Sequence, residues 1–184
     1  MAATKSLYNK LQKNSKAPFF KLQGTDGRMH SLLDFKNAKA VLIVFMCNHC
    51  PYVKPKMDAI NKLQMDFKDK GLIVIGINSN SAKIVPEDDF DHMTQIAKEK
   101  NFTFLYLHDE TQEVARAYGA SCTPDPFFLD KDQKLIFHSR LDSHHAEVLG
   151  NAKEMREAVS EYLAKGSISK QEEPSLGCSI KWNQ

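Results

Sequence analysis

The stretch Ala40-Val-Leu-Ile-Val-Phe-Met-Cys-Asn-His-Cys-Pro51 decides the fold. Its first seven residues are apolar and rich in β-branched side chains, which is typical of a strand covered by helices on both faces. Cys47 and Cys50 follow at C-x-x-C spacing, and a periodic apolar pattern begins after Pro51. We therefore predict the order strand, two-cysteine turn, helix.

The helix after Pro51 is predicted to run to about Lys70, with Gly71 as its C-cap. Its apolar positions recur at steps of three or four, so one face can pack on a sheet: Val53, Met57, Ile60, Leu63 and Phe67. The apolar run 72–77 follows directly. Strand, helix and strand then form a βαβ unit with parallel strands, which predicts the α/β class.

Outside this unit, the same patterns predict a hairpin at each side. Residues 19–32 form an amino-terminal hairpin around Gly24-Thr-Asp-Gly27, and 127–129 pair with 135–137. Helices are expected at 88–100, 111–118 and 151–165, and a strand at 102–107. Residues 1–165 are thus predicted to form one domain. Residues 166–184 form a tail that we expect to dock, because it contains Cys178 and the only tryptophan, Trp182.

Composition excludes several classes of partner. The chain has 184 residues with 25 basic and 23 acidic side chains, a net charge of +2, so neither nucleic acid nor a membrane is an expected partner. The first ten residues lack an apolar leader, and the longest apolar stretch is too short to span a bilayer. A cytoplasmic location is expected. Four cysteines in a reducing compartment indicate chemistry rather than a disulfide scaffold.

The two close cysteines have distinct expected roles. Cys47 lies where a strand ends and a helix begins, and the free backbone N–H groups and helix dipole there stabilise a thiolate. Cys47 is therefore the predicted nucleophile. Cys50, about one turn further on, is placed to attack a mixed disulfide on Cys47 and release the substrate. His49 between them would favour the thiolate further as an imidazolium or N–H donor.

Two other interpretations of the pair remain open: half of a zinc site, or two inert buried thiols. A c-type haem is excluded because Pro51, not histidine, follows Cys50. We expect no metal and no cofactor. The adjacent His144 and His145, with Asp142 nearby, are interpreted as solvated loop residues.

Several segments carry a resemblance to a known family. Beyond the C-x-x-C stretch, they are Gly76-Ile-Asn-Ser-Asn80, Asp109-Glu-Thr-Gln-Glu-Val114, Tyr118-Gly-Ala-Ser-Cys-Thr-Pro124 and Gly177-Cys-Ser-Ile-Lys-Trp182. Together with the element order, they resemble the thioredoxin superfamily, and more narrowly the peroxiredoxin-like bacterial redoxins related to alkyl hydroperoxide reductase and thiol-specific antioxidant. The resemblance implies a thioredoxin fold with an amino-terminal β-hairpin, a central mixed sheet flanked by helices, and a carboxy-terminal tail.

The resemblance also assigns residues. It implies that Pro124 is a cis-proline facing the cysteines, with Thr123 as a substrate-side contact, and that Pro55 kinks the helix after the cysteines. Two features depart from the family patterns. Val41 stands where thioredoxins carry a buried acid, so proton transfer from Cys50 would need His49 or water. The peroxiredoxin signature is incomplete, because its proline and hydroxyl residue are replaced by Ile43 and Cys47.

The sequence therefore predicts a thiol–disulfide oxidoreductase that uses a Cys47/Cys50 couple. The alternatives are a peroxiredoxin-like thiol peroxidase and, ranked last, a metal-binding or redox-sensing module. Expected partners are a disulfide-containing protein, a small thiol or a peroxide as substrate, and a cellular thiol reductant. Cys122 and Cys178 are candidates for auxiliary redox thiols, with a simple packing role as the alternative for each.

Overall fold

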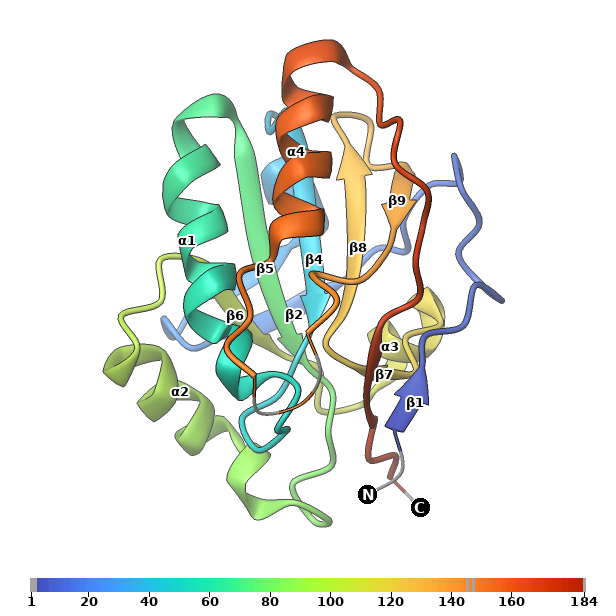
Figure 1. The fold of residues 1–184 in the computed structure, drawn as a ribbon. Coiled ribbons are helices and arrows are strands. Elements are labelled where there is room, and N and C mark those ends of the chain that lie inside the picture. Colours follow the sequence, from blue (N-terminus) through green and yellow to red (C-terminus); the bar gives the residue numbers. More distant parts are fainter. Residues whose placement is uncertain (1–2, 145, 147, 184) are drawn as a thin grey trace.

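The computed structural model describes residues 3–144, 146 and 148–183, which surround a seven-stranded mixed sheet of order β3-β2-β6-β5-β4-β8-β9. Its strands are β2 (Lys21–Gly24), β3 (Met29–Ser31), β4 (Ala40–Phe45), β5 (Leu72–Asn78), β6 (Leu105–His108), β8 (Asp125–Asp130) and β9 (Leu135–His138). The α-helices are α1 (Met57–Phe67), α2 (Phe90–Glu99), α3 (Glu113–Tyr118) and α4 (Lys153–Lys165). Helices α1 and α4 pack on one face of the sheet and α3 on the other (Figure 1). The predicted α/β class is confirmed.

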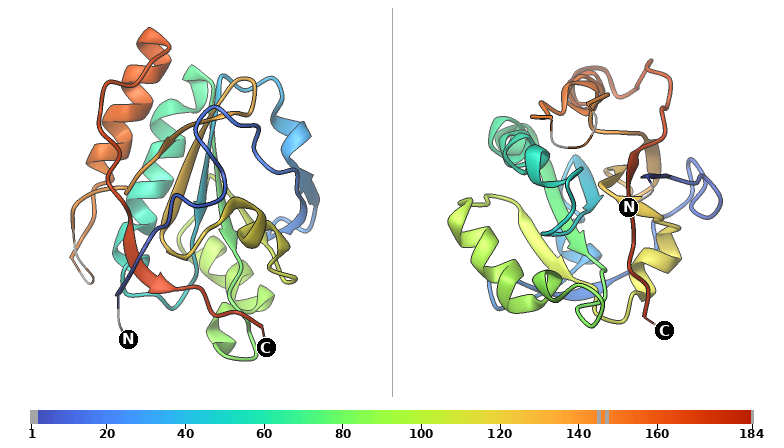
Figure 2. Two further views of the ribbon diagram at one scale, coloured as in Figure 1. Left: turned by 90° about the vertical axis from the view of Figure 1, so that its right-hand side faces the viewer. Right: turned by 60° about the horizontal axis from the view of Figure 1, so that its bottom comes forward.

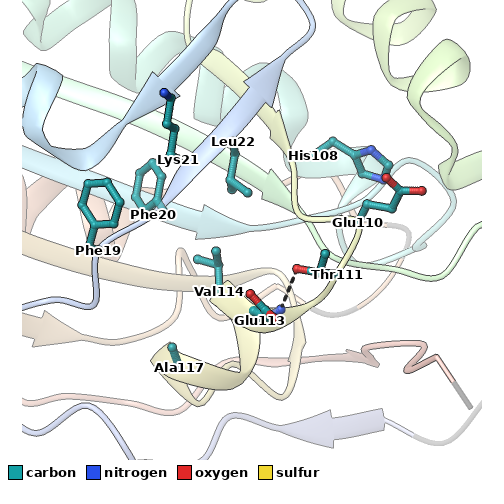
Figure 3. A pocket seen from close by; sticks show the side chains of 10 residues that line it. All are labelled: Phe19, Phe20, Lys21, Leu22, His108, Glu110, Thr111, Glu113, Val114 and Ala117. Carbon is teal, nitrogen blue, oxygen red and sulfur yellow. Dashed lines mark hydrogen bonds between the residues drawn. The ribbon is translucent and has the colours of Figure 1, made fainter.

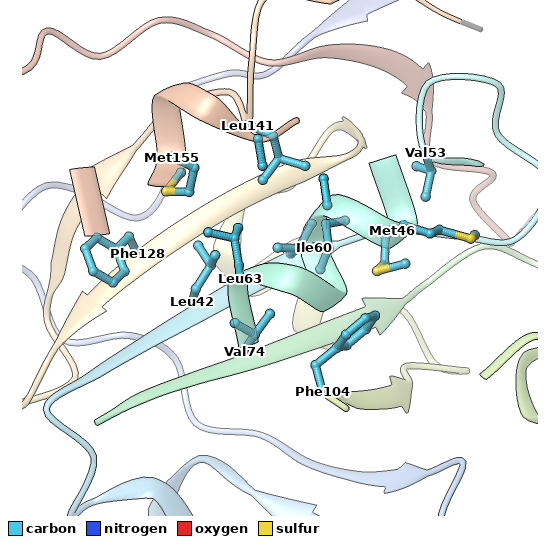
Figure 4. Packing of buried hydrophobic residues seen from close by; sticks show 14 of the residues in the cluster. Leu42, Met46, Val53, Ile60, Leu63, Val74, Phe104, Phe128, Leu141 and Met155 are labelled. Atoms are coloured by element: carbon cyan, nitrogen blue, oxygen red, sulfur yellow. The ribbon is translucent and has the colours of Figure 1, made fainter. Parts of the chain in front are cut away.

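Strand β4 is buried on both faces, as its unbroken apolar run predicts. Alternate side chains enter two separate core clusters, because successive residues of a strand point to opposite faces. Leu42 packs in the cluster with Leu63 of α1 and Met155 of α4 (Figure 4). Val41 and the other odd-numbered residues of β4 join the cluster that contains α3. Both cores thus fix the strand that leads into Cys47.

The register around β4 positions the two-cysteine turn. Strand β5 runs parallel to β4, with Phe45 opposite Ile77, while β8 runs antiparallel, with Phe45 opposite Asp125. The carboxyl end of β4 therefore lies beside the start of β8. Cys47 and Pro124 come from segments 77 residues apart, but the register brings those segments to one end of the sheet.

The helix predicted from Pro51 to Lys70 is divided in three. A 3₁₀ turn at Lys54–Lys56 precedes α1, and another at Lys68–Lys70 follows it. Pro55 lies in the first turn, where its missing N–H and fixed φ disfavour a regular α-helical start. Gly71 ends the segment with φ of 98°, as predicted. The prediction of one continuous helix was therefore wrong at its amino-terminal end, where a 3₁₀ turn precedes α1.

Four further elements start later than predicted, and two of them, α3 at Glu113 and α4 at Lys153, are late by two residues. Helix α2 begins at Phe90, because the Asp89 side chain caps it by accepting a hydrogen bond of 2.8 Å from the His92 N–H. Asp88 therefore lies outside the helix, in the short 3₁₀ turn Pro86–Asp88. Strand β6 begins at Leu105, not at 102, since Thr103 is bonded to Asn61 of α1. The remaining 3₁₀ turn is Leu32–Phe35.

The carboxy-terminal segment lies against the domain as a strand. Strand β10 (Leu176–Ser179) pairs antiparallel with β1 (Ala3–Lys5) on one side and with β7 (Cys122–Thr123) on the other. The two ends of the chain thus run side by side on one flank of the molecule (Figure 2). This three-stranded sheet was not predicted, because its strands of two to four residues are too short to show alternation.

Candidate active site

The two sulfurs of the C-x-x-C motif are buried beside Thr123. Cys47 Sγ lies 3.4 Å from Thr123 Oγ1 and 3.7 Å from His49 Nδ1. The Cys50 thiol donates a hydrogen bond of 3.2 Å to the Thr123 carbonyl oxygen. The Thr123–Pro124 peptide bond is cis. Thr123 therefore contacts both sulfurs, one through its hydroxyl and one through its backbone.

Asp88 contributes a buried carboxylate to this site. Its Oδ2 lies 2.5 Å from His49 Nδ1 and accepts a hydrogen bond of 2.7 Å from the Asn80 amide. Its Oδ1 accepts hydrogen bonds from the backbone N–H groups of Asn48 (2.7 Å) and His49 (3.2 Å). The loop after β5 thereby holds the two residues between the cysteines in place.

These contacts set the charges of the His49–Asp88 pair. Burial alone would raise the pKa of Asp88, but hydrogen bonds from His49, Asn80 and the Asn48 backbone hold that pKa below its ordinary value. The hydrogen bond to Asp88 raises the pKa of His49 despite partial burial. The pair is therefore an imidazolium and a carboxylate over a wider pH range than free histidine and aspartate.

The two thiols differ in pKa. Burial raises the pKa of Cys47 well above its ordinary value, reinforced by its hydrogen bond to Cys50 and by the Asp88 charge. The pKa of Cys50 is lowered to about 5, mainly by the hydrogen bond from Cys47 and also by Thr123 and Cys178. Of the two cysteines, Cys50 therefore ionises first, and the Cys47 thiol then donates to it.

Comparison with known proteins identifies the family. The redoxin family model matches residues 12–155. The chain belongs to the redoxin family. The crystal structure of an uncharacterized conserved protein from Geobacillus kaustophilus is 38% identical to this redoxin, with a TM-score of 0.92, and the match covers 100% of this chain and 97% of the other.

Two more distant relatives have named activities. Thiol-disulfide oxidoreductase ResA of Bacillus thuringiensis is 26% identical over 156 residues, which are 85% of this redoxin and 79% of ResA. The thioredoxin domain of a thiol-disulfide oxidoreductase from Bacteroides vulgatus is 20% identical, with a TM-score of 0.66, covering 84% of this redoxin and 99% of that domain. The second match supports the predicted thioredoxin fold.

The structure brings together most of the residues predicted for the site. Cys47, His49, Cys50 and Thr123 are in contact, and Pro124 follows Thr123 through the cis bond. Cys178 joins them, since it pairs with Thr123 and packs in the same buried cluster as Cys47 and Cys50. The Cys122 thiol instead points toward the Pro124 carbonyl oxygen, 3.9 Å away.

Sequence reasoning missed Asp88 as part of this redoxin's site. We interpreted it as a first-turn residue of a surface helix, whereas it is fully buried against His49. The available signal was the segment Gly76-Ile-Asn-Ser-Asn80, whose last residue holds the Asp88 carboxylate. Val41, where thioredoxins carry an acid, packs in the core, so Asp88 is the buried acid that lies beside this dithiol.

The loop before α4 contains Asp142 and His144, which we predicted to be solvated. The structure differs from this prediction in part. Asp142 is buried and pairs with the buried Lys56 at 3.1 Å, and it lies 3.3 Å from His144 Nδ1. The Lys56 ammonium also donates to the His144 carbonyl oxygen. These contacts are structural, joining the turn before α1 to the loop. His145 lies outside the described residues.

A surface pocket of about 510 Å³ lies away from the dithiol (Figure 3). The residues described as lining it contain no cysteine: Phe19, Phe20, Lys21, Leu22, His108, Glu110, Thr111, Glu113, Val114 and Ala117. Among the described parts of this redoxin, no helix combines the length and apolar character needed to cross a bilayer.

Proposed function

We propose that the chain, a thiol–disulfide oxidoreductase, exchanges disulfides through Cys47 and Cys50, with Cys47 as the attacking thiol and Cys50 as the resolving thiol. One observation carries the proposal: both sulfurs of the C-x-x-C motif lie against Thr123 at the cis-proline, with Cys47 Sγ 3.7 Å from His49 Nδ1. A thiolate that is already formed is the reactive species in disulfide exchange.

The first step uses the proton of the Cys47 thiol. Its transfer from Cys47 to Cys50 places the charge on Cys47, where His49 and the Thr123 hydroxyl lie close enough to stabilise it. The Cys47 thiolate then attacks one sulfur of a substrate disulfide. The substrate S–S bond breaks, and the other sulfur leaves as a thiolate.

The second step releases the substrate. Cys50 attacks Cys47 Sγ of the mixed disulfide, which expels the remaining substrate sulfur as a thiolate and leaves a Cys47–Cys50 disulfide; the proton of Cys50 passes to the expelled sulfur. Thr123 and Cys178, which also lower the pKa of Cys50, still favour this step after the Cys47 thiol has reacted. The substrate gains two electrons and the dithiol loses two.

The partners are proposed from this chemistry. The substrate is a disulfide-containing protein or a small disulfide, and a cellular thiol reductant returns the oxidised pair to the dithiol. We propose a cytoplasmic location, because four cysteines in 184 residues are too few for a disulfide scaffold and suit a reducing compartment. Cell fractionation with an antibody to the chain tests this location.

The reduction potential tests the function. The protein is equilibrated in glutathione buffers, acid-quenched and alkylated, and its free thiols are counted by mass spectrometry. We expect a reversible two-electron couple from an intramolecular disulfide that disappears in Cys47→Ser/Cys178→Ser, and its midpoint gives the direction of electron flow. The absence of such a couple in the folded wild type would overturn the proposal.

A thiol peroxidase is a second candidate, favoured by the lowered pKa of Cys50. Cys50 is also the residue that would take the peroxidatic position of the peroxiredoxin signature. In that reaction peroxide oxidises the thiolate to a sulfenic acid, which a second thiol resolves to a disulfide. Stopped-flow measurement of peroxide consumption distinguishes the two, since a rate comparable with a free thiol excludes a peroxidase.

A metal-binding module is a third candidate, because ligand atoms of Cys47, His49 and Asp88 lie within 4.8 Å of one another. Asp88 already accepts hydrogen bonds at both oxygens, which a metal would have to replace. We therefore expect no stoichiometric zinc in protein purified without a chelator, measured by plasma emission spectroscopy.

A further inference from the structure

The strand edge beside the cis-proline is occupied by the chain's own carboxy-terminal segment. Strand β10 pairs antiparallel with β7, the two-residue strand that ends at Thr123. An extended peptide that adds to a free strand edge gains main-chain hydrogen bonds in this manner. In this protein the strand that occupies the edge carries Cys178 of the same chain and places it beside Thr123.

The register determines which cysteine faces the site. Cys178 lies opposite Thr123, and Ser179 lies opposite Cys122. Directly paired residues of antiparallel strands share a face, and successive residues alternate. Thr123 points to Cys47, so Cys178 lies on the dithiol face and Cys122 on the other.

The contacts agree with this register. Cys178 packs in the same buried cluster as Cys47 and Cys50. Its pairing partner Thr123 lies 3.2 Å from Cys50 Sγ through its carbonyl oxygen and 3.4 Å from Cys47 Sγ through its hydroxyl. Three of the four cysteines thus gather around Thr123.

Close packing holds β10 in this position. Gly177 lies so near Thr123 that an added Cβ would be 2.0 Å from the Thr123 carbonyl oxygen. Beyond the strand, Ile180 is buried, and the Lys181 N–H donates to Asn80, the residue that also holds Asp88. The Trp182 ring stacks under the Arg116 guanidinium at 4.3 Å. The segment is therefore anchored on both sides of Cys178.

We propose that Cys178 is a third redox-active thiol, which exchanges with the Cys47–Cys50 disulfide to form a Cys50–Cys178 disulfide and free Cys47. This inference rests on the proposed function and extends it from two cysteines to three. The Cys178 thiolate attacks Cys50 Sγ, the Cys47–Cys50 bond breaks, and Cys47 leaves as a thiolate that takes the proton given up by Cys178. The step consumes no external oxidant or reductant.

Ionisation of Cys178 is coupled to the state of Cys50. Burial, the interaction with Cys50 and the Cys50 charge together raise the pKa of Cys178 to about 12, with Lys181 acting in the opposite direction. When Cys50 is in a disulfide its negative charge is gone. The thiol of Cys178 then ionises more readily, so exchange is favoured in the oxidised enzyme and suppressed in the reduced one.

The step transfers the disulfide toward the carboxy-terminal strand and restores a free Cys47. The regenerated Cys47 thiolate is then available to attack a second substrate disulfide, and the reductant acts on the Cys50–Cys178 disulfide. The substrate class implied for this edge is an extended peptide carrying a cysteine, since that is the chemistry of the segment that occupies it.

Disulfide mapping tests the proposal. Cys47→Ser is oxidised with glutathione disulfide, acid-quenched, alkylated and digested, and its disulfides are identified by mass spectrometry. We expect an intramolecular Cys50–Cys178 disulfide, absent in Cys47→Ser/Cys178→Ser and retained in the matched control Cys47→Ser/Cys122→Ser. A Cys50–Cys122 disulfide, or glutathione on Cys50 with Cys178 free, would overturn the proposal. Circular dichroism confirms that each variant tested is folded.

A second measurement separates this inference from the proposed function. In Cys178→Ser, a Cys47–Cys50 disulfide that forms reversibly in glutathione buffers upholds the two-cysteine function. If that couple is present while Cys47→Ser forms no Cys50–Cys178 disulfide, only the third-thiol inference fails. If no Cys47–Cys50 disulfide forms in the wild type or in Cys178→Ser, the proposed function fails, and the exchange step fails with it.

Discussion

Asp88 Oδ2 lies 2.5 Å from His49 Nδ1, which makes a buried ion pair out of a residue in the C-x-x-C motif and a residue 39 positions later. The pair stands directly against Cys47. Thioredoxins carry a buried acid at the position that Val41 occupies here. In this chain the buried acid beside the dithiol is Asp88 instead. The loop after β5, which carries Asp88, therefore fixes the position of the His49 side chain together with the C-x-x-C segment itself.

The first prediction concerns the pKa of His49. Asp88→Asn removes the carboxylate that raises this pKa, so we expect the His49 titration, followed by NMR of its ring protons, to move to lower pH. The matched control is Asp89→Asn, because Asp89 is adjacent but bonds to His92 at the surface, and asparagine still caps a helix. An unchanged His49 titration in Asp88→Asn would contradict this role.

The second prediction is a pH window of stability. The raised pKa of His49 contributes stability that is complete below its ordinary value of 6.5 and is lost as pH rises through the folded-state pKa. The lowered pKa of Asp88 contributes stability above 3.8 that is lost as pH falls through its folded-state value. Between pH 3.8 and pH 6.5, the free energy of unfolding of the wild type should therefore exceed that of Asp88→Asn by about 2 kcal/mol.

Urea unfolding under reducing conditions, followed by circular dichroism at several pH values, checks this window. The difference between the two proteins should narrow above pH 6.5 and below pH 3.8. A difference that stays constant across the range would show that Asp88 stabilises the fold only through its backbone hydrogen bonds.

The sequence predicted the central strands and the cysteine turn because their signals are local. Residues 40–46 are apolar without interruption, and β4 occupies nearly the same range. The position of Asp88 could not be predicted in this way, since it depends on the path of a polar loop that returns to the motif. Likewise, β10 is recognisable only through its partners, which pair Cys178 with Ala3 at the other end of the chain.

The third prediction assigns the attacking cysteine. Cys50→Ser should accumulate a mixed disulfide on Cys47 when mixed with a model disulfide, because no thiol remains at position 50 to resolve it. Cys47→Ser/Cys178→Ser, which lacks both the attacking thiol and the third thiol, should show no turnover. Peptide mapping of the trapped adduct distinguishes the roles, and turnover retained in Cys47→Ser/Cys178→Ser through adducts on Cys50 would reverse the assignment.

The fourth prediction concerns the ion pair that ties the turn before α1 to the loop before α4. Lys56 and Asp142 are both buried, and Lys56→Ala leaves the carboxylate without its partner. We expect a loss of roughly 3 kcal/mol in the free energy of unfolding. Lys54→Ala is the matched control, since Lys54 is exposed in the same turn and should change stability little. Equal stability of the two variants would refute the prediction.

The fifth prediction uses Gly177 to loosen β10. A methyl group 2.0 Å from the Thr123 carbonyl oxygen cannot be accommodated, so Gly177→Ala should displace the strand from β7 and destabilise the protein by about 1–3 kcal/mol. The displacement uncovers both buried sulfurs, and we expect faster alkylation of Cys47 and Cys50 by iodoacetamide. Ser179→Ala is the control, because Ser179 is exposed on the same strand. Alkylation at the wild-type rate in Gly177→Ala would show that β10 does not cover the dithiol.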